Sequence, residues 1–542
     1  MALLQFDCKK GGGKTDVVQS AGSAISGAVR VTVDPTVATF KAQALKALSA
    51  VQQAIIQAPW TQSTPYLFRK TNTVPRLYAR GGTGVAANAV QWVNGQAATS
   101  GFVTSHVCLT AAAPFTAIRL VFGNVDAVSY PISDASVAAG ATLNDLTNST
   151  DGARQNFVRV TFGGGSTGAT VPAAVGGVAS YLISDRIPVA SMTRQAGDAT
   201  TWSKAGGKLS DCFVLPLVHV RVAQPITSAS TPLLGQSSYG GNASTTDAPY
   251  TPAQPTITGQ MTAVTHKVDT TAQTSVGAAA ALTGTSSGTL SGILSMPITG
   301  IIFEYASNAM SVATMGDSIT RGAGILHDGS ADANSPANGS SRSWARVAPE
   351  TVSTMAQPIE FCHLALDGQS TTTFEGYFEA IIAAGIIPTH AVYASFSPND
   401  GPNGPGATQV TNLNAFLTRC AANNVYPITW TSIPVGLLAA QKQSNAGELA
   451  RLAWNASMRA GTLVNNAYGQ PIDYIEMELA GDGSGQIMSD LVTPIASMTN
   501  APVHWGDAAT TQNLHPNYTG DKVMRAQLAN KVSSIAARYF AA

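Results

Sequence analysis

The segment 315–320, with the sequence Met-Gly-Asp-Ser-Ile-Thr, places a serine where it could act as a nucleophile. Apolar residues precede this segment over 301–303 and 312–313. An apolar strand that ends in Gly-Asp-Ser predicts a tight turn that lifts Ser318 out of the edge of a sheet. A serine in that position can attack a carbonyl carbon if a histidine and oxyanion donors converge on it. The motif is weak by itself, because Gly-Asp-Ser is also common in turns, where Asp317 would support the backbone.

Three residues further along the chain could complete such a site. Gly368 and Asn399 follow the apolar segments 364–366 and 391–393, and His515 precedes a helical pattern at the C-terminus. Taken singly, the glycine and the asparagine are more typical of turns, and the histidine, which a proline follows, suits a helix entry. Their order is far more specific than one short motif, because several independent chance matches would have to coincide.

In this order and context, the serine, glycine, asparagine and histidine resemble the four motifs of the SGNH, or GDSL-type, hydrolases over roughly residues 300–542. The resemblance implies that Ser318 is the nucleophile and that His515 is its general base, which later protonates the leaving alcohol. It also implies an oxyanion hole made by the backbone N–H groups of Ser318 and Gly368 and by the side-chain amide of Asn399. We expect no metal and no other cofactor.

Two positions depart from the family pattern. The acid expected three residues before the histidine is replaced by Gln512, whose amide oxygen could accept the imidazole N–H but brings no negative charge to stabilise imidazolium. Asp507 is the nearest alternative acid, and a backbone carbonyl is the third candidate for the group that orients His515. Ser397 stands where the family has a glycine two residues before Asn399, which alters the loop but leaves the asparagine available.

The region beyond residue 300 alternates strands with helical patterns. The clearest helical patterns cover residues 407–423, 446–461 and 521–540. Alternation of this kind predicts an α/β fold with a parallel sheet, flanking helices and a site at the carboxyl ends of the strands. The family resemblance implies the flavodoxin-like, three-layer form of that fold.

The sequence predicts three parts. Residues 1–59 form a glycine-rich leader and an amphipathic helix over 36–58, which would serve as an anchor or an oligomerisation element. Residues 60–299 form a mainly antiparallel, jelly-roll-like β-sandwich, similar to the module that precedes the catalytic domain in some bacterial GDSL-type esterases. Within it, the Ser/Thr/Gly-rich stretch 224–292 is a linker or a set of long loops. Residues 300–542 form the catalytic domain.

Short runs with a period of two carry the sandwich prediction. They are separated by Gly, Asn, Asp and Pro, which is typical of antiparallel strands joined by turns. The clearest such runs are residues 117–122, 157–162 and 213–222.

The amino-acid composition limits the kinds of molecule that the protein is expected to bind. Charged residues make up 11% of the 542 residues, against about 25% in average globular proteins. Lys plus Arg equals Asp plus Glu at 30 each, which argues against a nucleic-acid partner, because phosphate binding relies on a basic excess. The richness in small and hydroxyl residues is typical of extracellular or virion proteins.

The sequence carries no membrane or targeting signal that we recognise. No apolar run is long enough to span a membrane, and the first ten residues lack the basic start and apolar core of a signal peptide. The five cysteines are widely spaced and odd in number, without metal-ligand spacing, and are expected to be reduced, buried thiols. They are Cys8, Cys108, Cys212, Cys362 and Cys420.

These features predict a serine esterase that acts by acyl transfer. We expect an ester-bearing carbohydrate as the substrate, with removal of O-acetyl groups from a cell-surface polysaccharide, because the catalytic region lacks an extended apolar lid segment. The expected location is extracellular or virion-associated, as for a phage tail protein, with a homo-oligomer or attachment to a virion through the N-terminal part. Two alternatives stay open: a glycan-binding or structural virion protein with a degenerate hydrolase domain, motivated by Gln512, and a lipase or short-chain carboxylesterase.

Overall fold

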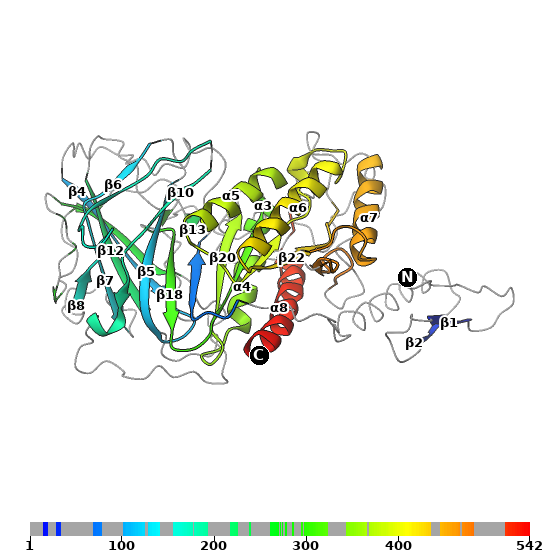
Figure 1. Ribbon diagram of the computed structural model, residues 1–542, viewed down its shortest axis with the longest axis horizontal. Helices are drawn as coiled ribbons and strands as arrows, with labels where there is room; N and C mark the ends of the chain where they lie inside the picture. The colour runs from blue at the N-terminus through cyan, green and yellow to red at the C-terminus, as the bar shows by residue number, and fades with distance from the viewer. Residues whose placement is uncertain are drawn as a thin grey trace.

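The computed structural model describes part of the chain (Figure 1), and every structural statement below refers to that part. The described residues are 15–19, 29–33, 69–78, 101–124, 128–140, 156–176, 178–192, 217–225, 238–239, 261–269, 272, 274, 277–278, 285–286, 294–295, 298–322, 343–365, 368–434, 445–466, 469–481, 515–516 and 518–541.

One ten-stranded sheet runs through the described part of the molecule. Its antiparallel end and its parallel end meet where β3 lies beside β20. The strand order is β10 (Ser180–Ile183), β5 (Phe115–Asn124), β18 (Gly300–Tyr305), β3 (Thr73–Leu77), β20 (Ile359–Ala365), β19 (Met310–Gly316), β21 (His390–Tyr393), β22 (Tyr426–Trp430) and β23 (Asp473–Ile475), with β11 (Ile187–Pro188) beside β5.

The parallel end has the order β20-β19-β21-β22-β23. After β19 the chain adds β20 on one side and then crosses to add β21 and its successors on the other. In open sheets of this kind, ligands bind at the carboxyl ends of the strands where the direction of winding reverses. That point lies at the end of β19, the strand that leads into Ser318.

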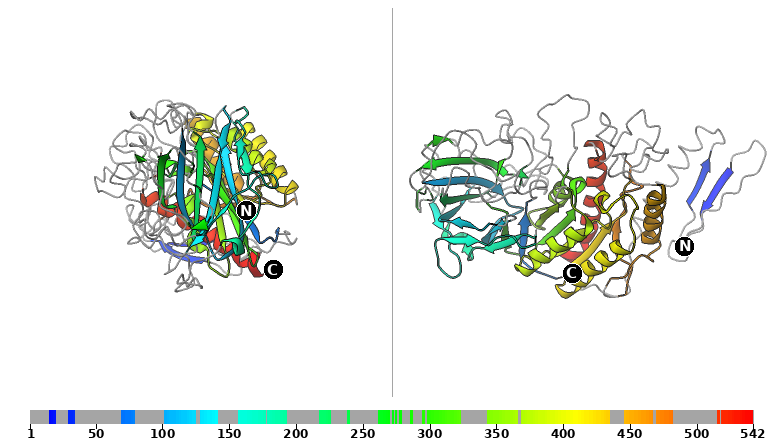
Figure 2. Two further views of the ribbon diagram at one scale, coloured as in Figure 1. Left: turned by 90° about the vertical axis from the view of Figure 1, so that its left-hand side faces the viewer. Right: turned by 90° about the horizontal axis from the view of Figure 1, so that it is seen from above.

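Helices cover both faces of the parallel end. Figure 2 shows α8 on one side of the sheet and α5 and α6 on the other, and α8 packs against α4 while α5 packs against α6. Their apolar faces form one core with the strands, in which Trp344, Phe378, Phe416 and Leu528 are buried. The helices are α3 (Ser318–Arg321), α4 (Trp344–Val352), α5 (Thr371–Ala383), α6 (Ala407–Ala422), α7 (Asn445–Arg459) and α8 (Tyr518–Ala541). The mixed α/β architecture and the helices expected at 407–423, 446–461 and 521–540 are confirmed, with ends that differ by at most three residues.

A second, seven-stranded antiparallel sheet faces the antiparallel end of the large one. Leu120 and Phe303 from the large sheet share a core with Val137 and Val220 from the smaller one. The order of the smaller sheet is β15 (Gly277–Ala278), β8 (Asn156–Arg159), β7 (Asp134–Gly140), β12 (Leu217–Pro225), β4 (Phe102–Thr110), β14 (Met261–Asp269) and β16 (Thr285–Ser286). Short pairs complete the described strands: β1 (Thr15–Gln19) with β2 (Val29–Val33), β6 (Tyr130–Ile132) with β9 (Ala169–Val171), and β13 (Ser238–Tyr239) with β17 (Leu294–Ser295).

Several local predictions need correction. The stretch 224–292 is not simply a linker, because β14 spans nine residues of it and pairs with β4. The run 157–162 forms a strand only to Arg159, and in the run 213–222 the described residues, which start at Leu217, form a strand as predicted. The leader contains the paired strands β1 and β2, while the helix expected over 36–58 lies outside the described residues.

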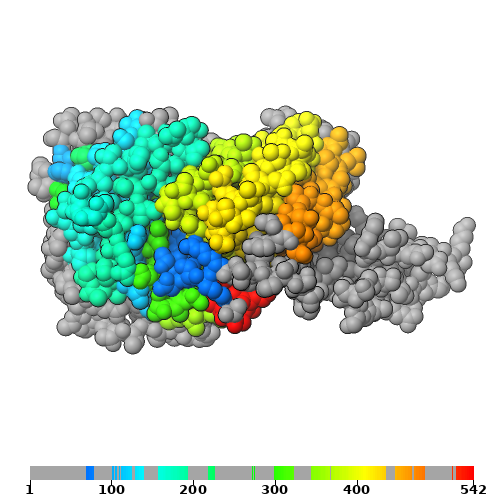
Figure 3. All heavy atoms as spheres, in the orientation of Figure 1, coloured from blue at the N-terminus to red at the C-terminus, as the bar shows by residue number. Residues whose placement is uncertain are grey.

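The strand that opens the range 300–542 is β18, and it pairs with the β-rich part, by which we mean the described residues of the range 60–299. β18 is antiparallel to both β5 and β3, and the parallel arrangement begins only at β19. In Figure 3, residues 69–78, drawn in blue, lie at the junction between the β-rich part and the helical part. No described helix is long and apolar enough to cross a membrane. Cys362 and Cys420 are free, buried thiols, as predicted.

Candidate active site

Ser318 lies directly beyond the end of β19, as the first residue of α3. The turn before it is tight, because a Cβ on Gly316 would come within 1.9 Å of Thr320 Oγ1. Asp317 caps the helix: its Oδ1 accepts a hydrogen bond from the N–H of Ile319 at 2.9 Å. The strand is fully buried, whereas Ser318 is half-buried, so the serine is held at the rim of the sheet.

His515 comes from the other end of the domain's sequence. It precedes α8, whose packing against α4 brings the C-terminal part of the chain to the same edge of the sheet. Its Nε2 lies 2.9 Å from Ser318 Oγ, a hydrogen-bonding distance. A neutral imidazole in this position can take the hydroxyl proton when the serine attacks.

Gly368 and Asn399 lie in the loops that follow the two neighbours of β19. Gly368 has φ of +67°, a left-handed backbone that favours glycine, in the loop between β20 and α5. Asn399 lies in the short 3₁₀ helix η7 (Pro398–Asp400) after β21. Its Nδ2 donates to Gln369 O at 3.1 Å, so the asparagine amide meets the glycine's loop.

One carboxylate connects the loop of Asn399 to the serine turn, and another connects the two loops to each other. Asp317 Oδ2 accepts a hydrogen bond from Ser397 Oγ at 2.6 Å. Burial raises the pKa of Asp317, while the hydrogen bonds from Ser397 and Ile319 and the nearby His515 act in the opposite direction. Asp400 accepts from the N–H of Ser397 at 2.9 Å and from the N–H of Thr371 at 3.0 Å.

Sequence reasoning missed the roles of Ser397 and Asp400. In the sequence, Ser397 is only a departure from the family glycine, yet in the structure its hydroxyl contacts both Asp317 and Asn399. A signal was present in the sequence, because Ser397 and Asp400 have the spacing of a capping box, which is the geometry observed.

Asp507 and Gln512, the two side-chain candidates for orienting His515, lie outside the described residues. Within the described part of the chain, no group of three or more His, Cys, Asp or Glu side chains could hold a metal ion.

A small pocket flanks the serine turn. Asp317 and Ile319 line it on one side, and Phe396, Pro398 and Trp430 line it on another. Most of its wall is apolar, which suits a short acyl chain better than a charged group.

Comparison of the whole chain with known proteins gives matches among solved structures. No family model and no curated protein matches the chain. A GDSL-like lipase from Bacteroides thetaiotaomicron is 17% identical with a TM-score of 0.27, over 42% of this chain and 88% of that chain. An acetylxylan esterase from Geobacillus stearothermophilus, solved as a catalytic mutant, is 12% identical with a TM-score of 0.27, over 41% of this chain and 94% of that chain.

A third match is longer. A family two carbohydrate esterase from Cellvibrio japonicus is 7% identical with a TM-score of 0.30, over 86% of this chain and 98% of that chain. At identities and TM-scores this low, the chemistry has to be inferred from the residues of this chain. The chain is thus similar to solved GDSL-type hydrolases and carbohydrate esterases, the kind of protein that its four motifs resemble.

Proposed function

We propose that the protein is a serine carboxylic ester hydrolase that removes O-acetyl groups from a carbohydrate. The observation that carries the proposal is the 2.9 Å contact between Ser318 Oγ and His515 Nε2, at the switch point of a parallel sheet. Ser318, Gly368 and Asn399 follow three adjacent strands, so one carbonyl group can reach the nucleophile and the oxyanion donors together.

The reaction would proceed in two halves. Ser318 Oγ attacks the ester carbonyl carbon while its proton passes to His515 Nε2, and the oxyanion is held by the N–H groups of Ser318 and Gly368 and by Asn399 Nδ2. Collapse of this intermediate breaks the bond to the alcohol oxygen, which takes the proton from His515. Water then attacks the acyl-enzyme with His515 as base, which releases the acid and restores Ser318.

The small apolar pocket beside Ser318 supports a short acyl group. Two of the similar structures are named as a carbohydrate esterase and an acetylxylan esterase, and we propose a carbohydrate substrate for this chain as well. An extracellular or virion-associated location is part of the proposal, and activity found only in fractions free of any particle or cell surface would contradict it.

Hydrolysis of 4-nitrophenyl acetate, butyrate and octanoate tests the proposal. The wild-type protein should prefer acetate, and Ser318→Ala should lower kcat/KM by about 10⁴-fold or more, because the nucleophile is lost. Ser191→Ala is the matched control, since Ser191 is exposed and its hydroxyl bonds only to Pro188 O among the described contacts. Preference for octanoate would indicate a lipase, and glycan binding without turnover, unchanged in Ser318→Ala, would indicate a binding protein.

The group that orients His515 remains a prediction, with Asp507, Gln512 and a backbone carbonyl as candidates. Asp507→Asn and Gln512→Ala distinguish them. Loss of a supporting carboxylate should lower kcat by about 10⁴-fold, whereas loss of a neutral amide should cost much less. If both variants keep wild-type kcat, the backbone carbonyl is the partner.

A further inference from the structure

A second pocket lies where the two ends of the ten-stranded sheet join. β3 and β20 are parallel there, but Leu77 and Cys362 are their only paired residues. β3 ends at this pair, whereas β20 continues to Ala365, and a pocket lies beside this end of β20. Leu77 and Thr299 line it from the β-rich part, and His363 and Ala365 line it from β20. Tyr78, Tyr181 of β10 and Tyr377 of α5 form its aromatic wall.

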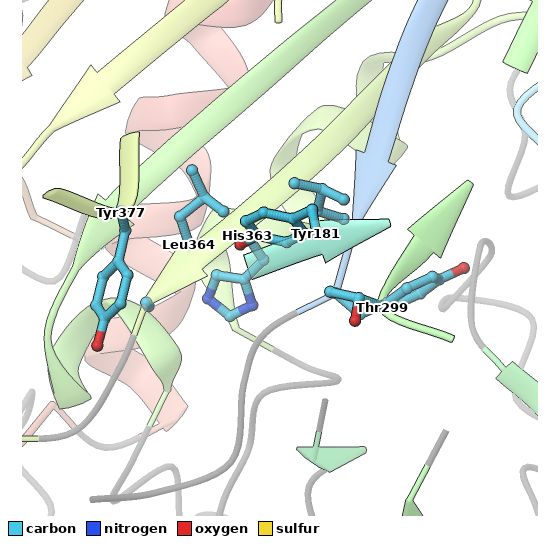
Figure 4. Close-up of a pocket in the computed structure, with 8 residues that line it drawn as sticks. Tyr181, Thr299, His363, Leu364 and Tyr377 are labelled. Atoms are coloured by element: carbon cyan, nitrogen blue, oxygen red, sulfur yellow. The ribbon is translucent and has the colours of Figure 1, made fainter. Parts of the chain in front are cut away.

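His363 brings an unused hydrogen-bond acceptor to this pocket. In Figure 4 its imidazole projects from β20, between Tyr377 and Thr299 in that view. Its Nε2 lies 2.9 Å from the carbonyl oxygen of Thr320, which can only accept, so Nε2 carries the proton. The other nitrogen, Nδ1, therefore presents a lone pair, and it is buried without a hydrogen-bond partner in the described structure. Since His363 is 1% exposed, this lone pair is a costly group to leave unpaired.

The surroundings determine what kind of donor fits. Burial and the neighbouring guanidinium groups of Arg346 and Arg321 lower the pKa of His363 to about 3, so the imidazole stays neutral at ordinary pH. The same positive charges disfavour an ammonium donor. Apart from His363, the side chains that line the pocket are apolar, aromatic or hydroxyl-bearing. The pocket therefore suits a neutral hydroxyl group on an otherwise apolar carbon skeleton. Its volume is about that needed by one water molecule, so it suits a single hydroxyl group rather than a whole sugar ring.

The pocket lies near the carboxyl end of β20, at the same edge of the sheet as Ser318, which follows the carboxyl end of β19. Ala365 pairs in register with Gly316, two residues before the nucleophile. His363, two residues before Ala365 on β20, pairs with Thr314 and so lies two residues deeper in the sheet than Gly316. The contact of His363 Nε2 with the carbonyl oxygen of Thr320, a residue of the short helix that begins at Ser318, shows that the pocket adjoins the serine turn.

We propose that this pocket, between the end of β3 and the carboxyl end of β20, is a binding subsite for a hydroxyl group of the saccharide, which donates its hydrogen bond to His363 Nδ1. The inference rests on the proposed carbohydrate esterase function. It adds a contact between the protein and a part of the substrate that does not react. Residues of the β-rich part and of β20 together form the pocket that makes this contact.

Two substitutions of the same histidine separate its two hydrogen bonds. In His363→Gln, the side-chain amide can still donate to Thr320 O, but the acceptor at the Nδ1 position is lost. In His363→Asn, a polar atom remains near the Nδ1 position, while the bond to Thr320 is lost. The readout is the ratio of kcat/KM for acetylated xylo-, manno- and gluco-oligosaccharides to kcat/KM for 4-nitrophenyl acetate, which has no sugar hydroxyl.

The subsite predicts that His363→Gln lowers this ratio about tenfold on the preferred saccharide, mainly through KM, as expected for the loss of one hydrogen bond. His363→Asn should keep the ratio within about threefold even if its thermal stability falls. His390→Gln is the control: this histidine is equally buried but begins β21, at the far end from the site, and should leave the ratio unchanged.

An unchanged ratio in His363→Gln overturns the subsite, as does an equal fall in both His363 variants or a wild-type enzyme that gains nothing from any of the saccharides. If the wild-type protein hydrolyses none of these esters, that result would instead refute the proposed function. If His363→Gln fails to fold, ¹⁵N NMR of the eight histidines in the wild-type protein replaces it. Methyl β-xylopyranoside should then shift the unprotonated Nδ1 resonance of His363 while ethanol at equal concentration does not, and identical responses would overturn the subsite.

Discussion

At the scale of single residues, the candidate site combines a standard pair with an unusual support. Ser318 and His515 are in direct contact, and Asn399 reaches the loop of Gly368 through Gln369 O. The support is Ser397, whose hydroxyl lies 2.6 Å from Asp317 Oδ2 and 3.3 Å from Asn399 Nδ2. Because this serine is fully buried, it can hold the serine turn and the asparagine in a fixed relation.

Asn399→Ala tests the oxyanion role. Removal of the amide donor should lower kcat on 4-nitrophenyl acetate by about 10²- to 10³-fold with little change in KM, because the contact strengthens only as negative charge develops on the carbonyl oxygen. Asn423→Ala, at the end of α6, removes an amide that bonds only to Arg419 O among the described contacts and should leave kcat unchanged. Equal kcat in wild type and Asn399→Ala would exclude the asparagine from the oxyanion hole.

At the scale of elements, three adjacent parallel strands deliver the groups. β19 leads to Ser318, β20 to the loop of Gly368, and β21 to the 3₁₀ helix with Asn399. Asp400 joins the last two loops, since one of its oxygens faces the N–H of Thr371 at the start of α5 and the other faces the N–H of Ser397. The loops are therefore positioned relative to each other by a carboxylate that need not touch the substrate.

Asp400→Asn tests this positioning role. An asparagine can accept only on one side, so its NH₂ group would face the N–H of Ser397 or of Thr371, donor against donor. We expect a kcat about tenfold lower at nearly constant KM, and a stability loss of about 1–2 kcal/mol in urea unfolding. Glu375→Gln, which disturbs only the ion pair of α5 with Arg419 on α6, should keep kcat. A stability loss without any change in kcat would make Asp400 merely structural.

At the scale of the whole molecule, the β-rich part and the helical part share one sheet. Arg76 of β3 pairs with Glu360 of β20 at 2.5 Å, and Tyr305 of β18 also donates to that carboxylate. All three side chains are buried, and the Arg76 guanidinium lies over the rings of Phe303 and Phe361. A buried ion pair is weak evidence for stability, but separating the two parts would leave its charges uncompensated, so we expect them to unfold together.

Glu350 makes the stability of this junction depend on pH. Burial raises its pKa to about 7, although Arg346 and Arg76 lower it in part. The folded protein therefore keeps this proton between about pH 4.5 and 7 while the unfolded chain loses it, so the free energy of unfolding falls as pH rises through that window and stays lower above it.

Glu350→Gln removes that proton linkage. Its free energy of unfolding relative to wild type should increase by on the order of 3 kcal/mol between pH 5 and pH 8 in urea titrations, because only the wild type must bury a carboxylate at the higher pH. Glu379→Gln, at a side chain that is 58% exposed, should shift stability by the same small amount at both pH values. Parallel pH profiles for wild type and Glu350→Gln would contradict the raised pKa.

The sequence alone determined the local features of the catalytic part. The helices over 407–423, 446–461 and 521–540 follow from apolar spacing, and the serine turn follows from Gly316 and Asp317, since both depend on residues close in the chain. The order of Ser318, Gly368, Asn399 and His515 was enough to predict their convergence, because parallel strands end at one edge.

Only the tertiary structure decided what depends on distant partners. The pairing of β14 with β4, and of β18 with both β5 and β3, joins segments far apart in the chain, and neither is visible in local periodicity. The roles of Ser397 and His363 emerge for the same reason, since each is defined by a hydrogen bond to another element: Ser397 to Asp317, and His363 to Thr320 O. Backbone pairing and side-chain contacts of this kind are set by how the elements pack, and a single sequence read along its length does not contain that packing explicitly.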